Sequence, residues 1–318
     1  MSNSALITGI NSQDGSYLAE LLLSKGYCVY GTLRTESYNN RHNIVNLENI
    51  LDKITLLEWN LSDKDTISKI IAKITPDECY HLAASVELAE DDVSIIDYNY
   101  NSTAYILSAI KNLSKSTKLF FAGSSEMYGN AQNYPQNENT SFNPRNMYGI
   151  TKLSSYYTIN YFRKKYDMYA CTGITYNHES KRRGKKYVTR KITSGVADIV
   201  KGNADHIELG NLNTAKDWGY APDYVQAMHM MLNNSKGPVD YVISTGILHT
   251  INDVVQTAFS VAGLNPKEFI RVNSNFDHTI DKVPLIGDSS KIRADLGWHP
   301  EKKFEDIITE MTLYDLGH

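Results

Sequence analysis

The sequence has little of what marks a membrane protein or a nucleic-acid-binding protein. No apolar run in its 318 residues approaches the ~20 residues that a membrane-spanning helix needs. Its formal net charge is −4, which gives no reason to expect a nucleic acid or an acidic membrane surface as a partner. The first residues lead directly into an apolar run and do not resemble a signal peptide, so we expect a cytoplasmic protein.

Cysteine is scarce, with three residues at Cys28, Cys79 and Cys171. The number is odd and the spacing is not that of a metal site, so we expect reduced core thiols and no bound metal. Hydrophobic residues make up 42% of the chain and charged residues 21%, ordinary proportions for a globular protein long enough to form two lobes.

Short apolar segments alternate with helical patterns over the first 120 residues or so. The strand-like segments are 5–8, 28–33, 54–59, 78–85 and 119–123, and helical patterns occur at 17–23, 67–74 and 98–112. This alternation predicts an α/β protein with a Rossmann-type, doubly wound parallel sheet. Ligands of such sheets bind at the carboxyl ends of the strands. His81 lies within a strand, and we interpret it as a packed core residue.

A glycine turn, Gly9 to Gly15, joins the first strand to the first helix. This layout is typical of a dinucleotide site, because a helix N-terminus offers free N–H groups to a pyrophosphate. Ser12 stands where a middle glycine would let the backbone approach phosphate. A glycine turn that only caps a helix is the alternative interpretation.

The second strand ends in Arg34, where an acidic residue would bind the ribose of NAD. Arginine suits a 2′-phosphate and therefore NADP, although Glu36 is close by and NAD remains the alternative. A solvated arginine explains this segment equally well. Further along, the strand at 78–85 ends in small residues, Leu82 to Ser85, where a nicotinamide ribose could approach the backbone.

Tyr148 and Lys152 are four residues apart in a helical pattern and therefore share one helix face. An ammonium near a phenol favours the phenolate, so this pair predicts a base for a sugar hydroxyl. Ser124 and Glu126 follow the strand at 119–123, where a ligand is expected, and offer a hydroxyl and a carboxylate. A surface Tyr/Lys pair and an ordinary Ser/Glu helix cap are the alternatives.

With these segments the chain resembles the extended short-chain dehydrogenases/reductases, and more narrowly the GDP-mannose 4,6-dehydratase family. The resemblance is carried along nearly the whole chain by residues 13–20, 124–129, 144–149, 177–184, 187–191, 209–212 and 216–219. The segments 177–180 and 217–219 are specific to the family, whereas Tyr-x-x-x-Lys is widespread.

The resemblance implies conversion of a GDP-hexose to its 4-keto-6-deoxy derivative without net redox change. Tyr148 would take the proton of the 4-hydroxyl while hydride passes to NADP⁺, and Lys152 would hold the nicotinamide ribose. Glu126 would remove the C5 proton and donate a proton to the departing 6-hydroxyl. Ser124 would hydrogen-bond O4, which completes a catalytic set of four residues.

The resemblance also implies binding residues and an assembly. Cofactor contacts are expected from Gly9, Ser12, Gln13, Asp14, Gly15, Arg34, Asn60, Leu61, Leu82, Ala83, Ser85, Tyr148, Lys152, His178 and Arg183. GDP-sugar contacts are expected from Ser85, Glu87, Ser125, Asn177, Val188, Lys191 and Lys216. The basic residues from Lys181 to Lys191 could instead form a solvated surface. Family members form homodimers or homotetramers.

We expect an NADP-binding domain over 1–175, to which a segment of about 213–236 returns. A smaller mixed α/β lobe for the GDP-sugar is expected mainly over 176–318.

Several positions depart from the family pattern. Ser124 replaces Thr, Asn60 replaces Asp, Lys216 replaces Arg, residues 86–88 replace His-Val-Lys, and residues 278–283 lack Arg-Pro-Thr-Glu-Val. Two of these changes face the sugar, so GDP-manno-heptose is an alternative to GDP-mannose. Oxidation or epimerisation at C4 without loss of water, and a nucleotide-sugar sensor, are the other hypotheses.

Overall fold

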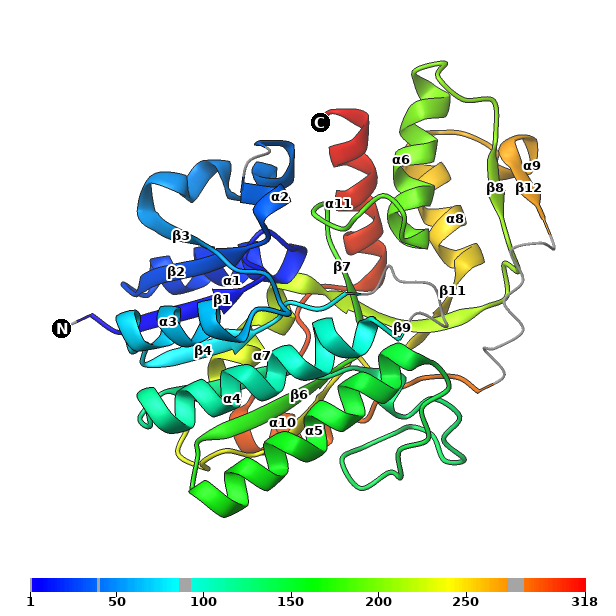
Figure 1. The fold of residues 1–318 in the computed structure, drawn as a ribbon. Helices are drawn as coiled ribbons and strands as arrows, with labels where there is room; N and C mark the ends of the chain where they lie inside the picture. Colours follow the sequence, from blue (N-terminus) through cyan, green and yellow to red (C-terminus); the bar gives the residue numbers. More distant parts are fainter. Residues whose placement is uncertain (1, 39–40, 86–92, 274–282) are drawn as a thin grey trace.

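The structure is a computed structural model that describes residues 2–38, 41–85, 93–273 and 283–318. Its centre is a seven-stranded parallel sheet with the strand order β3-β2-β1-β4-β5-β6-β10 (Figure 1). The strands are β1 (Ser4–Thr8), β2 (Cys28–Leu33), β3 (Ile54–Glu58), β4 (Glu78–His81), β5 (Lys118–Ala122), β6 (Ala170–Thr175) and β10 (Tyr241–Ile243). The Rossmann-type sheet that the sequence predicted is confirmed.

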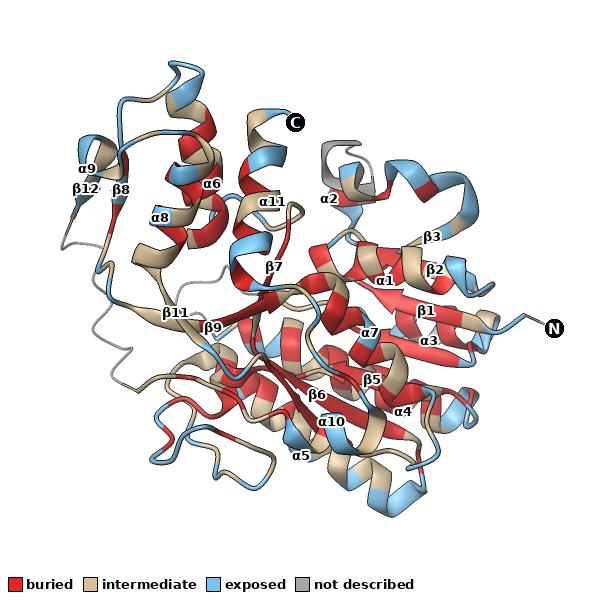
Figure 2. Cartoon of the chain, turned by 180° about the vertical axis from the view of Figure 1, so that it is seen from behind, coloured by how far each residue is buried: buried red, intermediate tan, exposed pale blue. Residues whose placement is uncertain are grey.

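Helices cover both faces of this sheet (Figure 2). One face packs against α1 (Gln13–Ser24), α7 (Ala221–Leu232) and α10 (Ser290–Leu296), and the other against α3 (Lys64–Ile74), α4 (Ser102–Leu113) and α5 (Met147–Tyr166). Side chains of a strand point alternately to the two faces. In β1, Ala5 and Ile7 therefore join one core and Leu6 the other. Burial on both faces explains the apolar runs of central strands such as β1 and β5.

The direction of winding reverses between β1 and β4. From β1 the chain proceeds outward to β3 on one side, and from β4 it proceeds to β10 on the other. Loops leaving neighbouring strands in opposite directions separate at such a point and leave a crevice at the carboxyl ends. Short helical segments follow strands at this edge: α2 (Thr35–Tyr38), a π-helical turn (Asp97–Asn101) and a 3₁₀ turn (Ser125–Met127). A 3₁₀ segment (Arg41–Lys53) leads from α2 back to the start of β3.

A second lobe has its own core, formed by side chains such as Ile192, Trp218 and Phe259 (Figure 1). Its three-stranded sheet has the order β11-β9-β7, and a two-stranded sheet pairs β12 with β8. The elements are β7 (Asn177–Glu179), α6 (Val188–Val200), β8 (Ile207–Leu209), β9 (Ala215–Tyr220), β11 (Leu248–Thr250), α8 (Ile251–Val261), α9 (Pro266–Phe269), β12 (Ile270–Val272) and α11 (Phe304–Leu316).

The chain returns to the central sheet more than once. Within the segment of about 213–236, α7 packs on the sheet, whereas β9 belongs to the small sheet of the second lobe. Beyond that segment, β10 adds the last strand and α10 packs beside it. A strand of three residues carries too little periodicity to be recognised in a sequence.

The cysteines only partly follow the expectation of core thiols. Cys79 and Cys171 are buried, and burial raises the pKa of the Cys79 thiol to about 12. Cys28 is exposed, and the expectation is wrong there, because this residue is the first of β2 and lies where the strand enters the sheet. All three thiols are free. Within the described ranges, no helix is long and apolar enough to cross a membrane.

A buried ion pair attaches the last helix to the second lobe. Arg190 in α6 donates to both carboxylate oxygens of Asp315 in α11, with Nε to Oδ2 at 2.8 Å and Nη2 to Oδ1 at 2.7 Å. The two side chains are only 8% and 6% exposed. The same guanidinium donates to the carbonyl oxygens of Lys181 and Arg183. The pair therefore also holds the loop that follows β7.

We expect Asp315→Ala to lower the free energy of unfolding by about 3–5 kcal/mol, because it leaves a buried guanidinium without its partner. Urea unfolding followed by circular dichroism measures this loss. Asp306→Ala, an exposed carboxylate in the first turn of the same helix, is the control, with an expected change of about 1 kcal/mol or less. Equal losses in both variants would contradict a special role for the buried pair.

Candidate active site

The first turn of α5 packs directly against the turn that follows β5. Asn146 caps α5, and its Oδ1 accepts a hydrogen bond from the backbone N–H of Gly149 at 2.8 Å. A Cβ atom at Gly149 would lie only 2.4 Å from the carbonyl oxygen of Glu126, so this close approach requires glycine. The helix that carries Tyr148 and the turn that carries Glu126 are therefore in contact.

Lys152 lies beneath this contact, with 3% of its surface exposed. Its Nζ donates to the carbonyl oxygen of Ala122, the last residue of β5, at 2.7 Å. The same nitrogen lies 5.6 Å from the ring centroid of Tyr148. Burial lowers the pKa of Lys152 to about 7, so that the amine is neutral in much of the population near physiological pH.

Tyr148 shares a helix face with Lys152, as the spacing predicted. Burial raises the pKa of its phenol, while a hydrogen bond with Ser124 acts to lower it. The phenol pKa is thus raised, and not lowered as the spacing predicted, because loss of solvent around the phenol outweighs the hydrogen bond with Ser124 and the charge of Arg183. Ser124 also accepts a hydrogen bond from the backbone N–H of Glu126 at 3.2 Å, so it caps the 3₁₀ turn as well.

Glu126 receives two donors from the residues just before α5. Asn146 Nδ2 donates to Oε2 of Glu126 at 3.0 Å, and Arg145 Nε lies 3.5 Å from the same oxygen. The side chain of Glu126 is 24% exposed and that of Arg145 is 4% exposed. The structure thus brings Ser124, Glu126, Tyr148 and Lys152 together, and it adds Arg145 and Asn146, which sequence reasoning missed. An Asn before an apolar helix is a capping signal, but its second contact is visible only in the fold.

A cavity of about 360 Å³ opens at the reversal between β1 and β4. Seven of its lining residues were predicted for the cofactor: Gly9, Ser12, Arg34, Leu61, Leu82, Ala83 and Ser85. The others are Asn11, Thr32, Leu33, Ser37, Trp59, Ala84 and Tyr98. Several of these unpredicted residues end a strand or follow one, and that position in the sequence could have identified them as lining the cavity.

The glycine turn beside this cavity is tightly packed and requires glycine at two positions. Gly9 has a φ of 71°, and a Cβ there would meet the backbone of Ala83 at 3.1 Å. A Cβ at Gly15 would lie 2.4 Å from the carbonyl oxygen of Gly9. Ser12 caps α1, with its Oγ accepting from Gly15 N at 3.1 Å, and its side chain faces the cavity. A helix N-terminus, small residues and Arg34 at one end fit a dinucleotide.

Gln13 and Asp14 turn their side chains toward the second lobe. Gln13 Nε2 donates to the carbonyl oxygen of His178 at 3.0 Å, and Ser180 Oγ donates to Gln13 Oε1 at 2.8 Å. Asp14 pairs with His178 Nε2 at 2.8 Å. Neither residue lines the cavity, nor does Asn60, whose side chain accepts hydrogen bonds from Ser62.

The Asp14–His178 contact is an ion pair when the histidine is protonated. The other ring nitrogen of His178, Nδ1, lies 2.7 Å from the carbonyl oxygen of Tyr176, so both nitrogens face acceptors, and the ring stacks on Tyr224. Burial opposes the charge of His178, but the Asp14 carboxylate raises the histidine pKa above its usual value. Burial likewise opposes ionisation of Asp14, and the charge and hydrogen bond of His178 lower its pKa.

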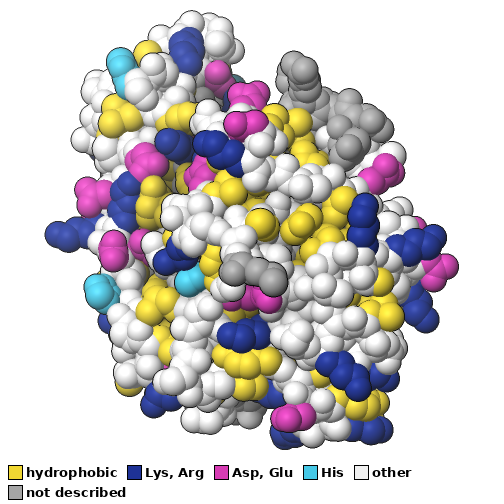
Figure 3. Space-filling view, turned by 90° about the vertical axis from the view of Figure 1, so that its left-hand side faces the viewer, with side chains coloured by type: hydrophobic (Ala, Val, Ile, Leu, Met, Phe, Trp, Pro, Cys, Tyr) yellow, Lys and Arg dark blue, Asp and Glu magenta, His cyan; other side chains and the backbone are white. Residues whose placement is uncertain are grey.

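The basic segment from Lys181 to Lys191 is largely paired. Arg182 contacts Glu20 at 2.5 Å, and Arg183 lies 3.4 Å from the buried Glu179 and stacks on the ring of Tyr187 at 3.7 Å. On the face drawn in Figure 3, basic and acidic side chains are interspersed rather than gathered into one basic patch. The segment is therefore more than a solvated surface.

The residues predicted for the sugar lie on several elements. Ser125 is buried in the turn after β5, and both backbone groups of Ser85 are held by the side chain of Asn99, at 2.7 and 2.9 Å. Asn177 and Lys216 lie on the paired strands β7 and β9. Val188 and Lys191 lie at the start of α6, where Lys191 Nζ donates to the carbonyl oxygen of Glu208 at 2.7 Å. Glu87 and residues 278–282 lie outside the described residues.

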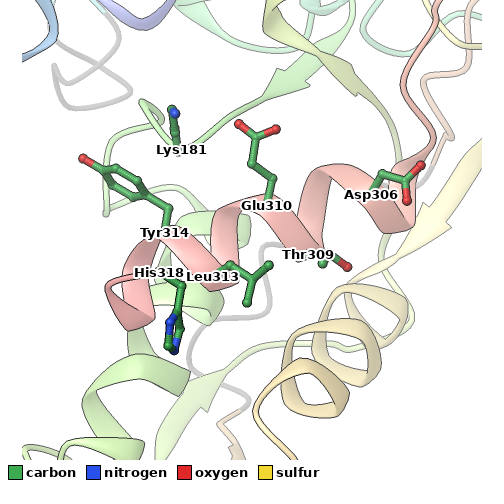
Figure 4. A pocket seen from close by; sticks show the side chains of 7 residues that line it. All are labelled: Lys181, Asp306, Thr309, Glu310, Leu313, Tyr314 and His318. Carbon is green, nitrogen blue, oxygen red and sulfur yellow. The ribbon is translucent and has the colours of Figure 1, made fainter.

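A second cavity, of about 370 Å³, lies along α11 (Figure 4). It is lined by Lys181, Asp306, Thr309, Glu310, Leu313, Tyr314 and His318. It shares no lining residue with the cavity at β1 and β4 and contains none of the predicted site residues. Among the described residues, no cluster of histidine, cysteine and acidic side chains could hold a metal ion.

Comparison with known proteins decides the family. A family model described as GDP-mannose 4,6 dehydratase matches residues 6–311. GDP-mannose 4,6 dehydratase 1 of Arabidopsis thaliana is 39% identical over an alignment of 326 positions, gaps included, which covers 98% of this chain and 89% of that protein. The chain belongs to the GDP-mannose 4,6-dehydratase family. It is accordingly an enzyme of the lyase class, and the resemblance seen in the sequence is confirmed.

Solved structures of similar fold belong to more distant proteins. The dTDP-glucose 4,6-dehydratase of Bacillus anthracis, determined with NAD, has a TM-score of 0.84 at 16% identity and covers 98% of this chain and 96% of its own. RMD from Pseudomonas aeruginosa, complexed with NADPH, has a TM-score of 0.83 at 17% identity and covers 99% of both chains. These similarities establish the fold of the chain.

We expect the Asp14–His178 pair to make stability depend on pH. The histidine pKa is raised above 6.5, so its contribution is complete below about pH 6.5 and is lost as pH rises through the folded-state value. The Asp14 pKa is lowered below 3.8, so its contribution is lost only as pH falls through a more acidic value. Asp14→Asn keeps a hydrogen-bond acceptor and removes the charge.

Urea unfolding of the wild type and Asp14→Asn near pH 5.5 and pH 8.5 measures this effect. The variant should be less stable by on the order of 1–2 kcal/mol at the lower pH and nearly equal at the higher pH. A difference that is the same at both pH values would contradict the ion pair. Asp306→Asn, on the exposed side of α11, controls for loss of a carboxylate.

Proposed function

We propose that the enzyme converts GDP-mannose, or a close relative, to its 4-keto-6-deoxy derivative by oxidation at C4, elimination of water across C5 and C6, and return of hydride to C6. Family membership supports the reaction type. The observation that carries the proposal is the Glu126 carboxylate held against the helix turn of Tyr148. A reductase or epimerase needs the Ser/Tyr/Lys groups but has no use for a carboxylate there.

In the first step, Tyr148 accepts the proton of the 4-hydroxyl as hydride leaves C4. Ser124, which hydrogen-bonds the phenol, also reaches O4 and stabilises the charge that develops there. A nicotinamide cofactor bound here would supply the hydride acceptor and a positive charge that favours the phenolate. Lys152, fixed to Ala122, would hold the ribose of that cofactor.

In the second step, the 4-ketone makes the C5 proton acidic, and Glu126 removes it. The protonated Glu126 then donates to the 6-hydroxyl, which leaves as water. Return of the hydride to C6, addition of a solvent proton at C5 and release of the Tyr148 proton to solvent would complete the reaction with no net redox change. Acid–base assistance of this kind contributes about 10²–10⁴-fold to rate.

For the cofactor we propose NADP, held in the cavity between β1 and β4. Arg34 and Ser37 line the end of this cavity that follows β2, where the adenosine ribose lies in such folds. A guanidinium and a hydroxyl suit a 2′-phosphate. We expect His178 and Arg183 to contact the cofactor from the second lobe, and NAD is the alternative cofactor.

The GDP-sugar would lie between the edge of the sheet and the lobe that carries Asn177, Val188, Lys191 and Lys216, which divides the chain into a cofactor domain and a sugar lobe. Because residues 86–88 differ from the family pattern, GDP-manno-heptose is tested beside GDP-mannose. A homodimer or homotetramer is part of the proposal, supported by exposed tyrosines along α5, namely Tyr157, Tyr161 and Tyr166.

Mass spectrometry after incubation with NADP⁺ in deuterated water tests the reaction. Loss of one water with deuterium at C5 is expected, and the faster of the two GDP-sugars identifies the substrate. Tyr148→Phe should lower turnover by about 10²–10⁴-fold, because no base remains for O4. Loss of two hydrogens without loss of water would replace the proposal with C4 oxidation, and cofactor binding without any product would favour a sensor.

Glu126→Gln separates the two chemical steps. It should leave a single-turnover burst of reduced cofactor, detected by absorbance, and abolish both water loss and deuterium incorporation at C5. The amide cannot accept a proton but preserves size and a hydrogen-bonding oxygen. An unchanged product yield would remove Glu126 from the elimination. Glu305→Gln, an exposed carboxamide swap on α11, is the matched control.

A further inference from the structure

We propose that Asn146 is a positioning residue of the elimination step: its amide holds the Glu126 carboxylate at a fixed place relative to Tyr148, with Arg145 as the second support. The proposal rests on the proposed role of Glu126 as the group that removes the C5 proton. It assigns Asn146 a function beyond capping a helix.

Both ends of the Asn146 amide are used, which fixes its orientation. Oδ1 accepts from the backbone N–H of Gly149 at 2.8 Å, and Nδ2 donates to Glu126 Oε2 at 3.0 Å. Exchanging the two ends would place an N–H against an N–H and a carbonyl against a carboxylate. The carboxylate is thereby connected through one rigid amide to the turn that contains Tyr148.

Arg145 reinforces this arrangement. Its Nε lies 3.5 Å from the same oxygen of Glu126, and its side chain is 4% exposed. Because both contacts go to Oε2, proton transfer at C5 falls to the other carboxylate oxygen. Glu126 and Tyr148 are also electrostatic neighbours, since the Glu126 charge acts to raise the pKa of the phenol. The spacing of the two groups is thus set by Arg145 and Asn146.

The chemistry requires such a fixed spacing. The hydroxyl at C4 and the proton at C5 are on adjacent ring atoms, so Tyr148 and Glu126 must both reach their targets in one bound sugar. A misplacement of about 1 Å can cost 10²-fold in rate. The backbone contact at Gly149 fixes the two turns, and the Asn146 amide then fixes the side chain.

Capping alone does not require asparagine. Serine, threonine and aspartate also cap helices, because each offers an oxygen to the first turn. Asparagine differs in carrying an N–H donor beside that oxygen. Asn146→Asp therefore keeps the cap and replaces a donor to Glu126 with a second carboxylate, and Asn146→Ser keeps the cap and removes the donor without adding charge.

The chain offers a matched control at another helix. Asn265 caps α9, with its Oδ1 accepting from Lys267 N at 3.2 Å, and its Nδ2 donates to the carboxylate of Glu268 at 3.0 Å. Asn265→Asp makes the same chemical change at an asparagine that also caps a helix and donates to a carboxylate, here on its own helix, at an exposed position outside the site. It should leave turnover and its pH profile unchanged.

The experiment measures three quantities for the wild type, Asn146→Asp, Asn146→Ser and Asn265→Asp with GDP-mannose and NADP⁺. They are the single-turnover rate of cofactor reduction, the steady-state rate of water loss with its KM, and the pH profile of water loss. For Asn146→Asp we expect water loss to fall by about 10–100-fold, with cofactor reduction and KM within about threefold of wild type. The acidic limb of its profile should move up by about one pH unit, because a neighbouring carboxylate disfavours ionised Glu126.

Asn146→Ser should also catalyse water loss more slowly than the wild type, and the acidic limb of its pH profile should move less than that of Asn146→Asp. It tests the proposal if the aspartate variant does not fold. Equal losses of cofactor reduction and water loss in both variants would assign Asn146 a structural role and overturn the proposal. If both variants catalysed water loss at the wild-type rate and with the wild-type acidic limb, the proposal would be overturned as well. A wild type that reduces cofactor without losing water would instead overturn the proposed function, which is a distinguishable failure.

Discussion

One buried hydrogen bond sets the geometry of the whole site, namely that of Lys152 Nζ to the carbonyl oxygen of Ala122. An amine with 3% of its surface exposed must find an acceptor, since an unpaired buried donor is costly. The acceptor is the last residue of β5, so α5 is held with its first turns over the end of that strand. Tyr148 lies one helical turn earlier and Glu126 just beyond the strand, and the two therefore meet at the carboxyl edge of the sheet.

The two lobes are joined by polar contacts as well as by apolar packing. Gln13 and Asp14, in the first turn of α1, bind the backbone and ring of His178 in β7. Farther along, Arg190 connects the loop after β7 to Asp315 in the last helix. The glycine turn beside the cavity at β1 and β4 is thus connected to the second lobe by directed polar contacts.

Much of the fold could be predicted because strands buried on both faces are short apolar runs, as at 119–123. The three-residue strand β10 could not, since it has no periodicity of its own and is stabilised by its neighbour β6. In the site, spacing alone brought Tyr148 and Lys152 to one helix face. The pKa of Tyr148 is raised where the spacing predicted that it would be lowered, because it depends on the burial of the phenol, which sequence distance does not show. The second contact of Asn146 likewise joins residues twenty positions apart.

Gly149 has a consequence for how this chain can diverge. A side chain there would meet the carbonyl oxygen of Glu126 at 2.4 Å, whereas its neighbour Ile150 is 42% exposed. A side chain at position 149 should therefore force the two turns apart, whereas a replacement at position 150 should leave them in place. Mutational tolerance across the helix that carries the reactive phenol should thus be uneven from one residue to the next, following contact with the strand-end turn and not distance along the chain.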